Sequence, residues 1–107
     1  MKQLSIICIL LFHLTIFGQD NTLSQQEKTD GWQLLFDGKS FNNWQVDKWN
    51  PKGFSVIDGS IKCNGKRSML YYNGPKKEFT DFHFVADVMT KERANSGIFF
   101  HTKYQDK

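Results

Sequence analysis

Five dipeptides of the type Asp-Gly or Asn-Gly divide the chain between residues 30 and 74 into short segments. They are Asp30-Gly31, Asp37-Gly38, Asp58-Gly59, Asn64-Gly65 and Asn73-Gly74. Such pairs tolerate positive φ angles, which the tight turns between antiparallel strands require. The segments between them are rich in aromatic and β-branched residues, and none of them shows a helical period. The pattern predicts an all-β domain of short antiparallel strands.

The sequence on either side of Asp58-Gly59 predicts its own strand pairing. A two-residue loop at this position fixes the register of the two flanking segments. The facing pairs are Val56 with Ile61 and Phe54 with Cys63. Because these four side chains share one face of the hairpin, we expect the thiol of Cys63 to be buried rather than reactive.

Two longer strands are predicted near the carboxyl end of the sequence. Residues 82–89 alternate, with apolar side chains on one face and His83 and Asp87 among those on the other. A polar break follows, and residues 97–104 form the second long strand. About six short strands build one sheet but leave one of its faces uncovered. We therefore expect the sequence to be truncated and to lack the second layer of a sandwich.

The first eighteen residues predict export. A basic start at Lys2 is followed by an apolar run over residues 4–17, and the sequence turns polar after Gly18. This run is shorter than the ~20 apolar residues of a membrane-spanning helix, so it is typical of a cleaved signal peptide, with a retained anchor as the alternative. We expect a signal peptide over residues 1–18, a secreted or periplasmic protein, and no stable membrane span after cleavage.

The charge of the remaining chain argues against nucleic acid as a partner. Without residues 1–18 it has thirteen basic and eleven acidic residues, and basic pairs such as Lys66-Arg67 form no stripe with stacking aromatics. One cysteine remains, so no internal disulfide can form. The residues define no metal-ligand set and identify no cofactor. Residues 19–30 are polar and predict a flexible lead-in to a domain over residues 31–107.

Polar side chains gather on and around the last two predicted strands. They are Asp87, Lys91, Glu92, Arg93, Asn95, His101 and Lys103. The odd-numbered positions from 93 to 103 share one side of a regular strand, which makes this group the candidate site. A solvated surface explains the same residues, since a lone His in a strand is often structural and Asn95 fits a turn before a glycine.

No general catalytic motif narrows the function further. The sequence has no phosphate-binding glycine loop, no nucleophile elbow and no pair of His at metal spacing. Three tryptophans, Trp32, Trp44 and Trp49, fit either a core or a set of sugar-stacking platforms. General catalytic motifs alone therefore do not identify the reaction or the ligand of this protein.

One longer pattern resembles a known family. The opening of the 3-keto-disaccharide hydrolase family is closely similar to residues 31–44 (GWQLLFDGKSFNNW). Later pieces follow in the family's order, namely the Asp-Gly hairpin after residue 54, the long strand from residue 81, and residues 94–100 (ANSGIFF), which resemble an Asn-Ser-Gly signature. The resemblance implies an antiparallel concanavalin-like β-sandwich, or jelly roll, whose concave sheet holds a sugar. It also implies that residues 31–107 are the amino-terminal part of such a domain.

The resemblance implies hydrolysis of glycosides that are oxidised at C3. A ketone at C3 acidifies the C2 hydrogen, so a base can remove it and the C1 glycosidic oxygen can leave before water adds. By position, Asn95 matches the family's Asn and would hydrogen-bond a sugar oxygen, and Asp87 would be a base or a ligand. His101 stands where Arg is common and offers a hydrogen bond without the permanent charge of Arg. We expect Arg93 and Lys103 to bind substrate.

Three functional hypotheses follow from the sequence. The first is a secreted carbohydrate-active hydrolase that cleaves 3-keto-glycosides by elimination and hydration, with Asp87 and His101 as its catalytic residues. The second is a non-catalytic carbohydrate-binding sandwich. The third is an inactive truncated fragment. The first two share a carbohydrate as the expected ligand.

Overall fold

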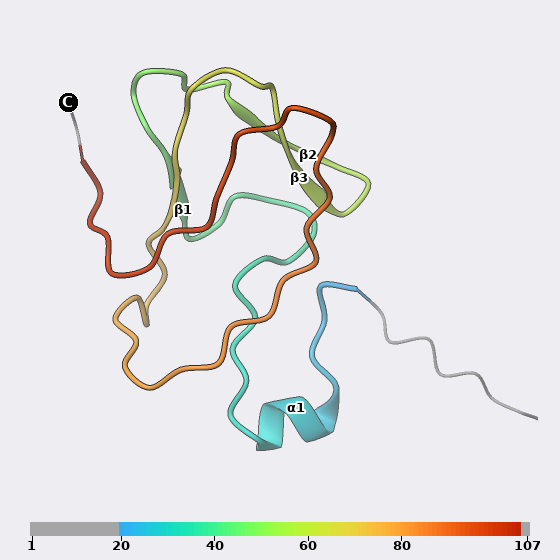
Figure 1. Ribbon diagram of the computed structural model, residues 1–107. Coiled ribbons are helices and arrows are strands. Elements are labelled where there is room, and N and C mark those ends of the chain that lie inside the picture. Colours follow the sequence, from blue (N-terminus) through green and yellow to red (C-terminus); the bar gives the residue numbers. More distant parts are fainter. Residues whose placement is uncertain (1–19, 106–107) are drawn as a thin grey trace, which may run out of the picture.

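A computed structural model describes residues 20–105 of the chain. Its elements in chain order are α1 (Gln25–Thr29), β1 (Trp44–Val46), β2 (Phe54–Ile57), β3 (Ser60–Cys63) and β4 (Leu70–Tyr72) (Figure 1). The strands form two antiparallel pairs, β1 with β4 and β2 with β3. The predicted antiparallel, all-β character is therefore confirmed, whereas the jelly-roll sandwich remains a prediction. The predicted signal peptide lies outside the described residues.

The β2–β3 hairpin has the predicted register. Its facing pairs are Phe54 with Cys63, Ser55 with Lys62, Val56 with Ile61 and Ile57 with Ser60. The loop has φ angles of 49° at Asp58 and 72° at Gly59, as a two-residue turn of primed type requires. The side chain of Asn21 donates a hydrogen bond from Nδ2 to the carbonyl of Gly59 at 2.8 Å. The segment before α1 is thus attached to the tip of the hairpin.

Replacing Gly59 with alanine should lower the free energy of unfolding by about 1–2 kcal/mol, because a Cβ is strained in the left-handed region. The added Cβ would meet only the Asn21 amide, at an ordinary 3.5 Å, so the loss would come from the backbone. Urea denaturation measures it. Gly59→Asn is the matched control, since asparagine tolerates this region better and should lose less. Equal stability of Gly59→Ala and the unchanged chain would contradict this account of the turn.

The prediction that Cys63 is buried was wrong, because its side chain is exposed. Val56 and Ile61 on the same face are only half-buried, and no apolar side chain within residues 20–105 is fully buried. A two-stranded hairpin buries a face only where another layer packs against it. The register of the hairpin therefore does not determine the burial of its side chains.

The two long strands predicted over residues 82–89 and 97–104 are absent from the described structure. After β4 the chain winds past the other elements without pairing, and nearly all of these residues are exposed (Figure 1). A strand forms only where a neighbouring segment exchanges backbone hydrogen bonds with it. Within residues 20–105, no segment pairs in this way with residues 82–89 or 97–104. Positive φ angles at Arg93 (63°) and His101 (57°) also interrupt the alternation, so the expected shared face is not formed.

The sequence pattern predicted no helix, and α1 is a correction to it. Ser24 and Glu27 form a capping box, in which the Glu27 N–H donates to the Ser24 hydroxyl (3.2 Å) and the Ser24 N–H donates to the Glu27 carboxylate (2.7 Å). These bonds satisfy amide groups that a helix start leaves free. Every residue of α1 is exposed, so an apolar period could not reveal it. Within residues 20–105, no helix has the length and apolar character to cross a membrane.

The carboxylate of Asp37 should titrate at an unusually low pH. It accepts hydrogen bonds from the N–H groups of Lys39 and Ser40, both at 2.8 Å, and from the Ser40 hydroxyl at 2.9 Å, and these bonds lower the pKa of Asp37. The turn is therefore stabilised fully above the ordinary pKa of about 3.9, and this contribution is lost as the pH falls through the lowered value. A carboxyl ¹³C NMR titration measures the shift, and Ser40→Ala should reduce it. An ordinary pKa at Asp37 would contradict the turn.

Candidate functional site

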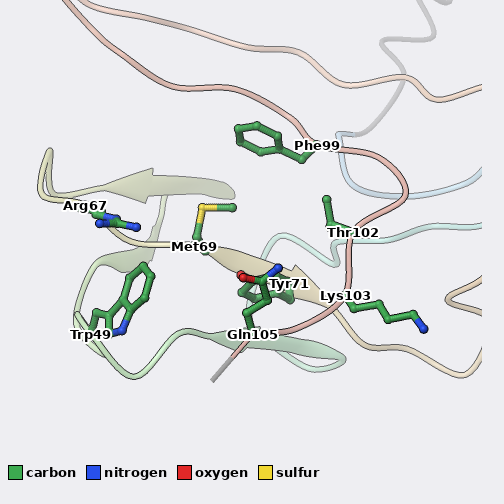
Figure 2. Close-up of a pocket in the computed structure, with 8 residues that line it drawn as sticks. All are labelled: Trp49, Arg67, Met69, Tyr71, Phe99, Thr102, Lys103 and Gln105. Carbon is green, nitrogen blue, oxygen red and sulfur yellow. The ribbon is translucent and has the colours of Figure 1, made fainter. Parts of the chain in front are cut away.

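One cavity, of about 190 Å³, is built from segments that lie far apart in the sequence (Figure 2). They are the loop after β1, the segment that leads into and forms β4, and the last described residues. The lining side chains are Trp49, Arg67, Met69, Tyr71, Phe99, Thr102, Lys103 and Gln105. A second hollow, of about 300 Å³, is formed by the four consecutive residues 75–78. Because the first cavity needs the fold to assemble it, we take it as the candidate site and call it the Trp49 pocket.

The structure separates the roles of the three tryptophans. Trp44 is half-buried, donates from Nε1 to the carbonyl of Leu35 at 2.7 Å, and packs edge-on against Tyr72, so it is structural. Trp32 packs against the ring of His83 at 5.3 Å, away from the pocket. Trp49 is 48% exposed and lies in the wall of the pocket. Of the three, Trp49 alone has the position of a ligand-stacking platform.

The walls of the Trp49 pocket are aromatic and open to solvent. Phe99 is 64% exposed and faces Met69 from the other side of the cavity (Figure 2). Tyr71 packs edge-on against Tyr104, with ring centroids 5.1 Å apart. The buried hydroxyl of Tyr104 has no hydrogen-bond partner within the described part of the chain. The exposed rings of this arrangement offer apolar surface to a flat ligand, whereas the buried Tyr104 hydroxyl is not among the groups that line the pocket.

The side chain of Asp47 fixes the loop that carries Trp49. Asp47 is only 3% exposed. Its Oδ2 accepts a hydrogen bond from the N–H of Met69 (2.6 Å), and its Oδ1 accepts from the N–H of Asn50 (3.1 Å) and the hydroxyl of Ser68 (3.4 Å). Trp49 lies within the turn that this carboxylate closes, and Met69 lines the pocket. We call Asp47, Asn50, Ser68 and Met69 the Asp47 cluster.

The Asp47 cluster also joins the two pairs of strands. The backbone carbonyl of Asn50 accepts a hydrogen bond from the N–H of Gly53 at 2.8 Å. The carbonyl of Gly53 in turn accepts one from the N–H of Asn64, just after β3, at 2.9 Å. A Cβ at Gly53 would lie 2.5 Å from the Ser68 hydroxyl, so only glycine permits this close approach. The base of the pocket is therefore tied to both β4 and the hairpin.

The charged side chains that line the Trp49 pocket are both basic. The guanidinium carbon of Arg67 lies 4.2 Å from the ring centroid of Trp49, a cation–π contact, and Lys103 lies at the opposite end (Figure 2). No carboxylate is among the lining residues. In the part of the chain that the structure describes, no three His, Cys, Asp or Glu side chains gather as a metal site requires. The site is therefore aromatic and cationic.

The structure brings one of the five predicted site residues to the pocket. Lys103 lines it, whereas Asp87, Arg93, Asn95 and His101 are exposed on the unpaired chain after β4. The ring of His101 lies 6.4 Å from that of Phe82. His101 directly precedes Thr102 and Lys103, so it adjoins the pocket along the chain. The roles of all five residues remain predictions.

Sequence reasoning did not identify Arg67, Met69, Tyr71 or Asp47 as parts of a site. Arg67 stands in a short basic stretch that resembles a solvated loop, and Met69 and Tyr71 belong to an ordinary apolar run. Asp47 stands three residues before Asn50 and directly after a strand, and this pattern is a turn signal that could have pointed to Asp47. Its burial depends on residues more than twenty positions away, which no local pattern reports.

Comparison with known proteins gives two findings. The family model of the 3-keto-alpha-glucoside-1,2-lyase-like domain matches residues 31–107. The 3-keto-disaccharide hydrolase of Bacteroides thetaiotaomicron is 31% identical over 80 residues, which cover 66% of this chain and 27% of that protein. The chain thus spans about a quarter of the length of that curated relative. No solved structure matches the chain.

Proposed function

Because the chain belongs to the family of 3-keto-α-glucoside-1,2-lyase-like domains, we propose that it acts in the cleavage of glycosides that carry a ketone at C3. The match of the family model over residues 31–107 carries the proposal. The relative from Bacteroides thetaiotaomicron is named a 3-keto-disaccharide hydrolase, which supports the same substrate class. Export by the predicted signal peptide is part of the proposal, because it would bring the protein to saccharides outside the cytoplasm.

The proposed reaction is an elimination followed by a hydration. A base removes the proton from C2, and the electron pair of the broken C2–H bond forms an enolate with the C3 ketone. The enolate then returns to the ketone and forms a C1=C2 double bond while the C1–O bond breaks. The departing oxygen takes up a proton and leaves as an alcohol. Water then adds a hydroxyl group to C1 and a hydrogen to C2, so the net change is hydrolysis without oxidation or reduction. The reaction needs a base and a donor that stabilises the enolate oxygen at C3.

The proposed roles follow the chemistry of the side chains. Asp87 is the base for the C2 proton, and His101 donates a hydrogen bond to the enolate oxygen. Arg93, Asn95 and Lys103 bind sugar hydroxyl groups. Support comes from the position of Lys103 in the Trp49 pocket and from the nearness of His101 along the chain, since a sugar stacked in the pocket would come close to this segment.

Incubation of the chain with a 3-keto-disaccharide in D₂O tests the proposal. We expect deuterium at C2, which reports the base, and the release of free sugars, which reports the whole reaction. The parent disaccharide without the ketone is the control and should stay unchanged, because its C2 hydrogen is not acidic. If both deuterium exchange and sugar release stay at the rate measured without protein, the proposed reaction is overturned.

A second candidate function is saccharide binding without catalysis. It is favoured by the lining of the Trp49 pocket, which has exposed aromatic rings and no carboxylate to serve as a base. The same incubation separates the two candidates, because a binding module would bind the 3-keto-disaccharide with saturation and leave its C2 hydrogen in place.

A further inference from the structure

We propose that the Trp49 pocket takes an acidic sugar unit, a saccharide residue that carries a carboxylate, and that Arg67 is the residue that binds this carboxylate. The proposal rests on the proposed function in one respect, namely that the ligand is a saccharide. It goes further in naming the charge of the ligand and the residue that selects it.

The charge of the pocket carries the first step. Arg67 and Lys103 line the pocket, and no Asp or Glu does. Among residues 20–105 the nearest carboxylate that the structure ties to the pocket is that of Asp47, and it accepts hydrogen bonds from Met69, Asn50 and Ser68 rather than from either cation. A neutral sugar would offer Arg67 and Lys103 no charge, whereas a carboxylate would meet them with charge-assisted hydrogen bonds.

The contact between Arg67 and Trp49 carries the second step. The guanidinium carbon lies 4.2 Å from the centroid of the indole ring, and no hydrogen bond from the guanidinium to a side chain or carbonyl is found among residues 20–105. A contact with a ring face does not use the N–H donors, so they stay available to hold a carboxylate through two parallel hydrogen bonds. The ring also limits the motion of the side chain, so less conformational entropy is lost on binding.

The shape of the pocket carries the third step. Trp49 and Arg67 stand at one end, Thr102 and Lys103 at the other, and Met69 and Tyr71 between them (Figure 2). A sugar ring between the ends would place its carboxylate at Arg67 and its hydroxyl groups near Thr102. The volume of about 190 Å³ is below the range of roughly 300–1,000 Å³ for drug-sized ligands, so the pocket admits one sugar ring.

Binding of glucuronate and of glucose to the whole chain tests the proposal, because the two sugars differ only in the carboxylate at C6. We expect glucuronate to bind about tenfold more tightly in a calorimetric or NMR titration, the effect of one charge-assisted contact. Added salt should reduce this preference, since the paired groups are exposed. Equal affinities, or no saturable binding of glucuronate, would overturn the proposal.

Substitutions at Arg67 locate the effect. Arg67→Gln should abolish the preference for glucuronate, and Arg67→Lys should retain only part of it, because lysine keeps the charge but not the fork. Lys66→Gln is the matched control, since it removes one neighbouring charge outside the pocket and should leave the preference unchanged. If Lys66→Gln and Arg67→Gln lose the preference for glucuronate to the same extent, the preference is a general effect of charge and the assignment of Arg67 is overturned. Amide NMR spectra of each variant establish that the chain is folded.

A third probe, acetate, separates a sugar acid from a simple anion. We expect acetate to bind at least tenfold more weakly than glucuronate, because it cannot contact the aromatic walls. Equal binding of both anions would overturn the proposal. None of these probes carries a ketone at C3, so the result does not depend on cleavage. Failure of the 3-keto-disaccharide incubation would leave the preference for glucuronate standing, and loss of that preference would leave cleavage standing.

Discussion

Replacing Asp87 with asparagine should lower both deuterium exchange at C2 and sugar release from a 3-keto-disaccharide by about 10²–10⁴-fold, the usual contribution of a general base. Asparagine has nearly the same size but cannot accept the C2 proton. The two rates should fall together, because removal of this proton precedes the loss of the glycosidic oxygen. Mass spectrometry of the recovered substrate and assay of the released sugar measure them.

The matched control for this substitution is Asp58→Asn. It makes the same chemical change on an exposed side chain in the hairpin loop, where asparagine tolerates the positive φ of 49°. We expect both rates to stay within about twofold of those of the unchanged chain, as is usual for surface positions. If Asp87→Asn and Asp58→Asn behave alike, Asp87 is not the base.

Replacing Asp47 with alanine should lower the free energy of unfolding by about 2–3 kcal/mol, because it leaves the N–H groups of Met69 and Asn50 and the hydroxyl of Ser68 without their common acceptor. The carboxylate is almost fully buried, so water replaces these bonds poorly. Urea denaturation followed by tryptophan fluorescence measures the change. The emission of Trp49 should also shift, because its loop loses its anchor.

Glu78→Ala is the control for Asp47, since it removes a carboxylate that is exposed and has no hydrogen bond within the described residues. It should change the free energy of unfolding by less than about 0.5 kcal/mol. A loss in Asp47→Ala no larger than that of Glu78→Ala would show that the Asp47 cluster does not hold the pocket together.

The parts of the fold that the sequence predicted are those that local geometry determines. The two-residue loop at Asp58-Gly59 leaves one register to its flanking strands, and the structure has that register. The capping box of α1 is equally local, because its signal lies in Ser24 and Glu27. A search for apolar periodicity does not detect it, since α1 has no buried residues. Short-range rules therefore predicted the turn and the hairpin pairing, whereas the cap of α1 was missed although its signal is local.

The parts that the sequence did not predict depend on partners elsewhere in the chain. An alternating pattern over residues 82–89 describes two faces, but it becomes a strand only when a neighbour pairs with it. Cys63 has the correct strand partner and is nevertheless exposed, because no second layer covers its face within the described residues. Asp47 is buried by hydrogen bonds to residues more than twenty positions away. The Trp49 pocket is assembled in the same long-range way, so of the predicted site residues only Lys103 lies in it.

The most direct test of the central claim, that a 3-keto saccharide binds in the Trp49 pocket, is an NMR titration of the isotopically labelled chain with a 3-keto-disaccharide. We predict saturable shifts of the Trp49 indole N–H and of the amides of Met69, Phe99 and Thr102, with little change at residues 75–78. Shifts that do not saturate, or saturable shifts that leave the Trp49 indole unchanged, would contradict it.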